Sequence, residues 1–124
     1  MTEAEIHKAI VEWLILALPS GSVFHHSPNE GRHKVQYRML QKKLGVKAGW
    51  PDLELFIHPD GWKKGCYADW CPIFLEIKKP GGRVSANQKE VIADLVVTGC
   101  LVFIVHSIDE VREALKELIE LKDG

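Results

Sequence analysis

Apolar residues recur at helical spacing in some segments of the chain and form short apolar runs in others. Between Ile6 and Ala17 they recur every three or four positions, which predicts a helix that ends at residues 19–21. Short strands are predicted at residues 23–26, 53–57, 73–77 and 101–105. Further helices are predicted at residues 34–44, from residue 86 to Gly99, and after Ser107. This order of elements predicts an α/β fold with a mixed β-sheet.

Three polar segments fit the capping-box pattern, in which Ser or Thr is followed three residues later by Glu or Gln. They are residues 2–5 (TEAE), 85–88 (SANQ) and 107–110 (SIDE). Each stands directly before an apolar periodic segment and therefore predicts a helix start. The last helix is expected to present Val111, Leu115, Leu118 and Ile119 on one side.

Length and composition limit the class of protein. With 124 residues, of which 46% are hydrophobic, residues 1–124 are expected to form a single domain. The odd set of Cys66, Cys71 and Cys100 favours a reducing compartment, so a cytoplasmic protein is expected. The apolar run at residues 13–18 is too short to cross a membrane, so no membrane association is expected. Because the net charge is only −1, any contact with nucleic acid must come from a local basic patch.

Charged residues interrupt two apolar stretches of the chain and are candidates for a functional site. Asp52 follows Pro51 at the start of one strand, and Glu76 and Lys78 stand two residues apart at the end of the most apolar strand. Because side chains alternate along a strand, Glu76 and Lys78 share a face. If the two strands are neighbours, Asp52 approaches Glu76, and the converging carboxylates favour a hard cation such as Mg²⁺. The carbonyl of Ile77 is a further candidate ligand, and Lys78 would lie near a bound water, a set suited to phosphodiester hydrolysis.

Asp52, Glu76 and Lys78 with their neighbours resemble the PD-(D/E)XK nuclease signature. More narrowly, three segments resemble the virus-type replication-repair nuclease (VRR-Nuc) domain, including its small stand-alone phage and bacterial members. They are residues 45–52 (GVKAGWPD), 74–78 (FLEIK) and 85–88 (SANQ). The resemblance covers nearly the whole chain and implies a restriction-endonuclease-like core.

The resemblance also implies a function and further site residues. It implies a DNA endonuclease dependent on Mg²⁺ or Mn²⁺, with an acid on the first helix joining Asp52 and Glu76 at the metal. Glu3 and Glu5 are the candidates, and Glu3 is favoured because Glu5 is used in a capping box. Gln88 matches the helical glutamine of the family and would support the site or contact the substrate. Cleavage of branched DNA such as Holliday junctions by a homodimer, in a bacterium or a phage-infected cell, is expected on the same ground.

Charge is distributed unevenly in a way that fits a DNA substrate. Residues 31–50 contain six basic residues and no acidic one, whereas the last helix is rich in acids. The basic residues are Arg32, Lys34, Arg38, Lys42, Lys43 and Lys47. The stretch ends next to Asp52, where a phosphate backbone would lie.

Other interpretations stay open at this point. The chain can be a catalytically inactive nucleic-acid-binding subunit with the same fold, or a hydrolase of small phosphate esters. Gln88 can serve only the helix cap, and Glu3 can serve only the helix dipole. His25 and His26 are expected on opposite strand faces, and His58, Cys66 and Cys71 lack zinc-site spacing. Residues 61–71 form an insertion of open role.

Overall fold

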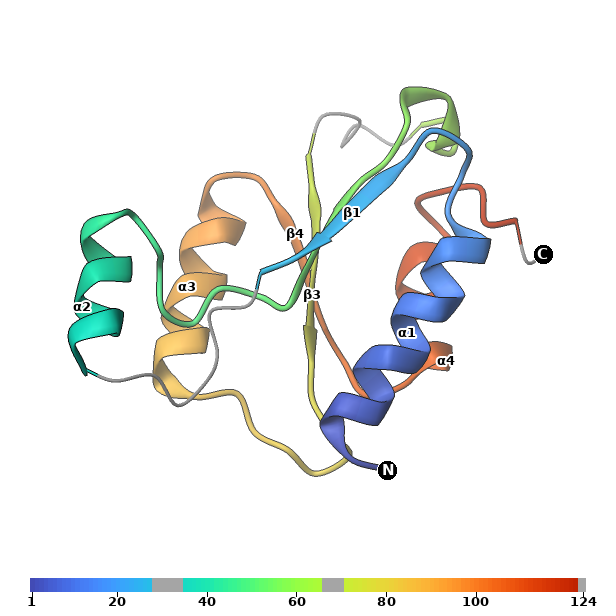
Figure 1. Ribbon diagram of the computed structural model, residues 1–124. Coiled ribbons are helices and arrows are strands. Elements are labelled where there is room, and N and C mark those ends of the chain that lie inside the picture. Colours follow the sequence, from blue (N-terminus) through green and yellow to red (C-terminus); the bar gives the residue numbers. More distant parts are fainter. Residues whose placement is uncertain (28–34, 66–70, 123–124) are drawn as a thin grey trace.

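The computed structural model describes residues 1–27, 35–65 and 71–122 (Figure 1). Its centre is one sheet of four strands in the order β1-β2-β3-β4. The strands are β1 (Val23–His26), β2 (Leu53–Phe56), β3 (Ile73–Ile77) and β4 (Leu101–Val105). β2 pairs antiparallel with β1 and β3, whereas β3 and β4 are parallel. The mixed sheet predicted from the sequence is confirmed.

Helices cover both faces of the sheet. α1 (Glu3–Ala17) and α4 (Ile108–Leu115) lie on one face, and α3 (Ala86–Val97) lies on the other, where it connects the parallel strands β3 and β4 (Figure 1). Alternation along β3 divides its side chains between the two layers. Leu75 and Ile77 join the larger core with α1 and α4, and Phe74 packs with Val91 of α3. β3 is therefore buried on both faces of the sheet.

Two of the three predicted capping boxes are present in full. Thr2 and Glu5 exchange side-chain and backbone hydrogen bonds at the start of α1, and Ser85 and Gln88 do so at the start of α3. The third prediction was only half right. Ser107 Oγ accepts the N–H of Glu110, but the Glu110 carboxylate instead contacts Nδ1 of His106 at 2.9 Å.

The last helix is shorter than its apolar pattern predicts. α4 ends at Leu115, and Ile119 lies beyond it, where it forms an isolated antiparallel bridge with Trp62. The same contact places the described start of the insertion, residues 61–65, against the C-terminal segment. The insertion ends at residue 71, two residues before β3 begins, whereas Glu76 and Lys78 stand at the other end of that strand. Cys66 and Trp70 lie outside the described residues.

α2 (Val35–Lys43) forms where the sequence predicts it and stands apart from the core (Figure 1). None of its residues is buried. Its basic residues Arg38, Lys42 and Lys43 are exposed, and so are apolar ones such as Leu40. Arg32 and Lys34 of the basic stretch lie outside the described residues. Within the described ranges, no helix is long and apolar enough to cross a membrane.

Candidate active site

The predicted site residues gather where β2 begins and β3 ends. β2 and β3 pair Leu53 with Leu75 and Glu54 with Phe74, so the next pair along the ladder is Asp52 and Glu76. Directly opposed residues of antiparallel strands point to the same face of a sheet. Asp52, Glu76 and Lys78 are thereby placed on the face that α3 covers. The separate segments that carry the motif thus meet at one sheet edge.

Asp52 is held against the backbone of β3. Its carboxylate Oδ2 accepts a hydrogen bond of 2.7 Å from the N–H of Ile77, the residue between Glu76 and Lys78. The side chain is buried, with 8% of its surface exposed. A buried carboxylate needs such donors because the cost of losing water is large. The bond fixes the carboxylate beside the Glu76–Lys78 pair.

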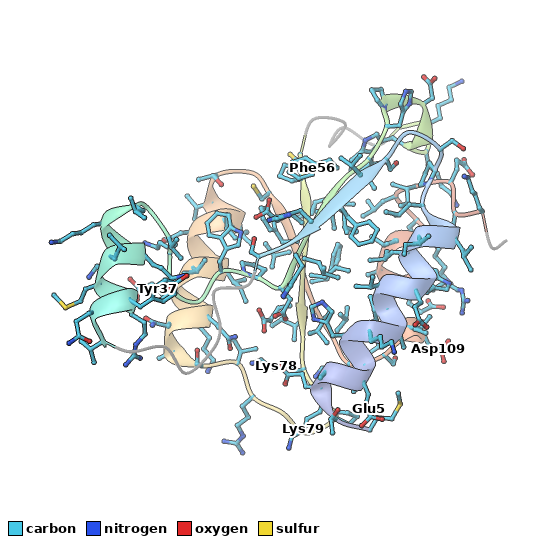
Figure 2. The ribbon with its side chains drawn as sticks, viewed as in Figure 1. Glu5, Tyr37, Phe56, Lys78, Lys79 and Asp109 are labelled. Carbon is cyan, nitrogen blue, oxygen red and sulfur yellow. The ribbon has the colours of Figure 1, made fainter. Side chains whose placement is uncertain are left out.

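Glu76 is almost completely buried, with 1% of its surface exposed. Its Oε2 lies 3.5 Å from Nζ of Lys78 and accepts a 3.1 Å hydrogen bond from Nε2 of Gln88. Lys78 itself is only 13% exposed. A charge this deep is stabilised only when an opposite charge and hydrogen bonds compensate it. Figure 2 shows Lys78 at the end of β3, between the N-terminal ends of α1 and α3.

Gln88 is hydrogen-bonded both within the helix cap and to Glu76. Its Oε1 accepts the N–H of Ser85 at 2.9 Å, while its Nε2 donates to Glu76. The backbone N–H can only donate, so the amide oxygen must face Ser85 and the NH₂ group must face Glu76. The two readings of Gln88 that the sequence left open are therefore compatible.

Gly49, which stands three residues before Asp52, occupies a position that has no room for a larger side chain. Its φ is +84°, and a Cβ at this position would lie 2.9 Å from the carbonyl oxygen of Asn87 and 3.1 Å from N of Gln88. Only glycine allows the loop to approach the N-terminus of α3 this closely. The contact holds the segment that leads to Asp52 against the helix that carries Gln88.

Comparison with known families and structures agrees with this geometry. The model of the VRR-NUC domain family matches residues 3–109. The chain belongs to this family. A solved structure described as a VRR_NUC domain protein is 26% identical, with a TM-score of 0.69 over 94% of this chain and 86% of the other. No curated protein matches the chain. The family and fold that the sequence predicted are confirmed, and the VRR-NUC domain places the chain in a nuclease-type family.

The two acids of helix α1 occupy different environments in this VRR-NUC domain. Glu5 is exposed at the helix end (Figure 2), and a hydrogen bond from the backbone N–H of Thr2 lowers the pKa of its carboxyl group. Glu3 is partly buried, and its charge acts on His7, one helical turn further along. Of the two, Glu3 is therefore the one that lies on the side of the site. Its role as a metal ligand stays a prediction.

Two histidines that sequence reasoning did not assign lie beside Asp52. Nδ1 of His26 is 2.8 Å from the carbonyl oxygen of Asp52, and because a carbonyl only accepts, this nitrogen carries the hydrogen. The His26 ring meets the ring of His7 edge to face, with centroids 4.6 Å apart. Burial lowers the pKa of His7, as does the nearby His26, while Asp52 and Glu3 act in the opposite direction. The net effect lowers the pKa of His7 and so favours its neutral form.

The oxygen donors of this VRR-NUC domain fit a hard divalent cation. Asp52 and Glu76 contribute buried carboxylates, which are ligands that Mg²⁺ and Mn²⁺ prefer. Within the described ranges, no group of three or more His, Cys, Asp or Glu side chains is arranged to hold a metal ion. Glu3 is thus not gathered with Asp52 and Glu76 into a set of three carboxylates. A cation held by two carboxylates would keep several waters, as Mg²⁺ commonly does.

The Gly49 contact predicts a large difference between two glycine substitutions in the VRR-NUC domain. Gly45→Ala introduces only left-handed strain, because nothing lies within 4 Å of a Cβ there, and should lower the free energy of unfolding by about 1–2 kcal/mol. Gly49→Ala adds a clash with helix backbone and should cost about 1–3 kcal/mol more. Urea unfolding of both variants measures the difference. Equal losses would show that the close approach of Gly49 to α3 does not matter.

Proposed function

We propose that this VRR-NUC domain is a DNA endonuclease that depends on Mg²⁺ or Mn²⁺. The observation that carries the proposal is the hydrogen bond from the Ile77 N–H to Asp52, because it joins Asp52 to the Glu76–Lys78 pair. The two buried carboxylates and the Lys78 ammonium share one face of the sheet and have no evident structural purpose there. Their chemistry matches what phosphodiester hydrolysis requires.

Asp52, Glu76 and the carbonyl of Ile77 would hold the metal, with Glu3 as the acid from α1. When bound, the cation supplies charge neutralisation at the phosphate and lowers the pKa of a water molecule. His26 and Ser27 both donate to the carbonyl oxygen of Asp52 and so fix its backbone. The rigid backbone keeps the Asp52 carboxylate directed at β3 before substrate arrives.

Lys78 would position the attacking water and offset the negative charge that develops on the phosphate. Its ammonium is held 3.5 Å from Oε2 of Glu76, so a positive charge lies directly beside the carboxylate. Gln88 would orient Glu76 through the amide hydrogen bond. Such partners of a metal ligand fix its direction without contacting the metal.

The basic residues of α2 would supply the phosphate contacts. Arg38, Lys42 and Lys43 are exposed, and the chain runs from this helix directly to Asp52. Branched DNA is the proposed substrate and a homodimer the proposed assembly, since a four-way junction needs two cuts and each domain offers one. A strict monomer in size-exclusion chromatography that cuts linear duplex as fast as junctions would contradict this part.

The direct test is cleavage of supercoiled, single-stranded and branched DNA by the pure protein with and without Mg²⁺ or Mn²⁺. We expect cutting only with the metal, and none with EDTA. Binding without cutting at any metal concentration would favour an inactive nucleic-acid-binding subunit. Turnover of a nucleotide panel without DNA cleavage would favour a hydrolase of small phosphate esters.

Gln88 and Ser85 provide a matched pair of variants, because only Gln88 contacts Glu76. Ser85→Ala should lower the free energy of unfolding by about 1 kcal/mol through the lost cap and leave cleavage near the wild-type rate. Gln88→Ala should lower the free energy of unfolding further, by about 2–4 kcal/mol, because the buried Glu76 also loses a hydrogen bond. It should also reduce the cleavage rate by roughly 10- to 100-fold. Parallel unfolding and single-turnover assays separate the two effects. Equal activity of both variants would reduce Gln88 to a capping residue.

A further inference from the structure

A pocket of about 400 Å³ opens on the face of the sheet that carries the carboxylates. It lies between β1, β2 and the segment after α2, and Ser27, Val46, Lys47, Trp50 and Glu54 are among the residues that line it. Its size is in the range of pockets that hold small organic groups. None of the roles assigned above to Asp52, Glu76, Lys78 or Gln88 uses this pocket.

The pocket adjoins the candidate active site along β2. Glu54 stands two residues after Asp52, so both side chains point to the same face, about 6.6 Å apart along the strand. Its cross-strand partner on β1 is His25, which also lines the pocket. This separation is about twice the 3.4 Å rise per nucleotide of a DNA strand. The pocket therefore lies within a few nucleotides of a phosphate held at Asp52.

Glu54 is held in a fixed orientation at the wall of the pocket. Nε1 of Trp50 donates to its Oε1 at 2.6 Å, and Oγ of Ser27 donates to the same oxygen at 3.0 Å. Trp50 is itself fixed by edge-to-face packing on Phe74, with ring centroids 5.6 Å apart. The hydrogen bonds of Glu54 among the described residues all end on Oε1. Oε2 is therefore the acceptor that Glu54 can offer to a ligand.

We propose that this pocket binds an unpaired DNA base next to the scissile phosphate and that Glu54 selects a base with an amino group in the position of N4 of cytosine or N6 of adenine. The inference rests on the proposed nuclease function and names the part of the substrate that the enzyme reads. Lys47 at the rim places a positive charge where the backbone of the extruded nucleotide passes. An enzyme that needs an unpaired base acts preferentially on branch points, where unstacking costs least.

The hydrogen-bond chemistry of Glu54 decides which bases are accepted. A carboxylate oxygen only accepts, so it pairs with the N4 amino group of cytosine or the N6 amino group of adenine. Thymine and guanine present a carbonyl oxygen, O4 or O6, in the corresponding position, and two acceptors facing each other repel. We therefore expect cytosine or adenine at this position to be cut at least about tenfold faster than thymine or an abasic site.

Glu54→Gln tests the proposal by reversing the polarity of the wall. Because the Trp50 N–H can only donate, the amide oxygen of glutamine must take the Oε1 position, and its NH₂ group then occupies the position of Oε2. The variant should cut thymine-containing branched substrates faster than cytosine-containing ones. Single-turnover rates are measured on branched DNA with cytosine, adenine, thymine or an abasic site at each of three positions on either side of the cut. The exposed Glu120→Gln serves as the control and should keep the wild-type preference.

Two outcomes would overturn the base pocket while leaving the nuclease intact. They are equal wild-type rates on all four substrates, and an unchanged preference in Glu54→Gln. A wild type that cuts no DNA would instead overturn the proposed function, and the fluorescence of pyrrolocytosine, which keeps an N–H donor in the N4 position, then decides the pocket. On saturating binding, the signal should rise at one or two unpaired positions and be lost in Val46→Trp, which fills the pocket. Binding without a position-dependent rise, or a rise that persists in Val46→Trp, would reject the pocket.

Discussion

Replacing Lys78 with glutamine is expected to reduce metal-dependent DNA cleavage by about a thousandfold. The substitution removes the ammonium that lies 3.5 Å from Glu76, while the glutamine amide keeps a hydrogen-bond donor on the same side chain. Charge stabilisation at the phosphate is lost, whereas the exposed basic residues of α2 are untouched. DNA affinity should therefore change by no more than a few fold. Single-turnover cleavage and equilibrium binding to the same labelled junction measure the two quantities.

Lys79→Gln is the matched control for this variant. Lys79 is the next residue along the chain, is exposed, and points away from the neighbouring Lys78 side chain (Figure 2). It should change cleavage by no more than a few fold, through weakened attraction to DNA alone. Equal losses in the two variants would mean that Lys78 acts through general attraction to DNA. A fully active Lys78→Gln would remove lysine from the mechanism.

The elements of the fold were predictable because their signals are local. The capping boxes at Thr2 and Ser85 and the apolar runs of the strands act over a few residues, and the structure contains each element they predict. The errors at the last helix have a different cause. Ile119 continues the apolar spacing of α4, but pairing with Trp62, which is 57 positions away in the chain, ends the helix first. A tertiary contact therefore set the end of the last helix, which the local pattern left ambiguous.

The site was predictable only in part because its assembly depends on strand register. Alternation places Glu76 and Lys78 together, but only the pairing of β2 with β3 sets Asp52 opposite Glu76. The double use of Gln88 follows from the distance between α3 and β3, which no spacing in the sequence encodes. The same holds for His7 and His26, which come from different elements. His7 stands one helical turn after Glu3, and this spacing is the signal in the sequence that could have identified it.

Asp52→Asn is expected to abolish metal-dependent cleavage, lowering it by a thousandfold or more, while the fold stays intact. The asparagine carbonyl can still accept the N–H of Ile77, which Asp52 now binds at 2.7 Å, but the negative charge that a cation needs is gone. Asp52→Ala should lose the same activity and, in addition, lower the free energy of unfolding by about 1–3 kcal/mol. The reason is that the buried N–H of Ile77 is left without an acceptor.

Thermal unfolding with and without Mn²⁺ separates the structural role of Asp52 from its role at the metal. A cation that binds only the folded protein stabilises it by about 2.7 kcal/mol at a hundred times its Kd. The melting temperature of the wild type should therefore rise with Mn²⁺, whereas Asp52→Asn should show the wild-type melting temperature without metal and little rise with it. If Asp52→Asn gains as much from Mn²⁺ as the wild type, the cation binds elsewhere. If Asp52→Asn without metal is as unstable as Asp52→Ala, the negative charge of Asp52 stabilises the fold. The hydrogen bond to Ile77, which asparagine retains, would then not be what matters for stability.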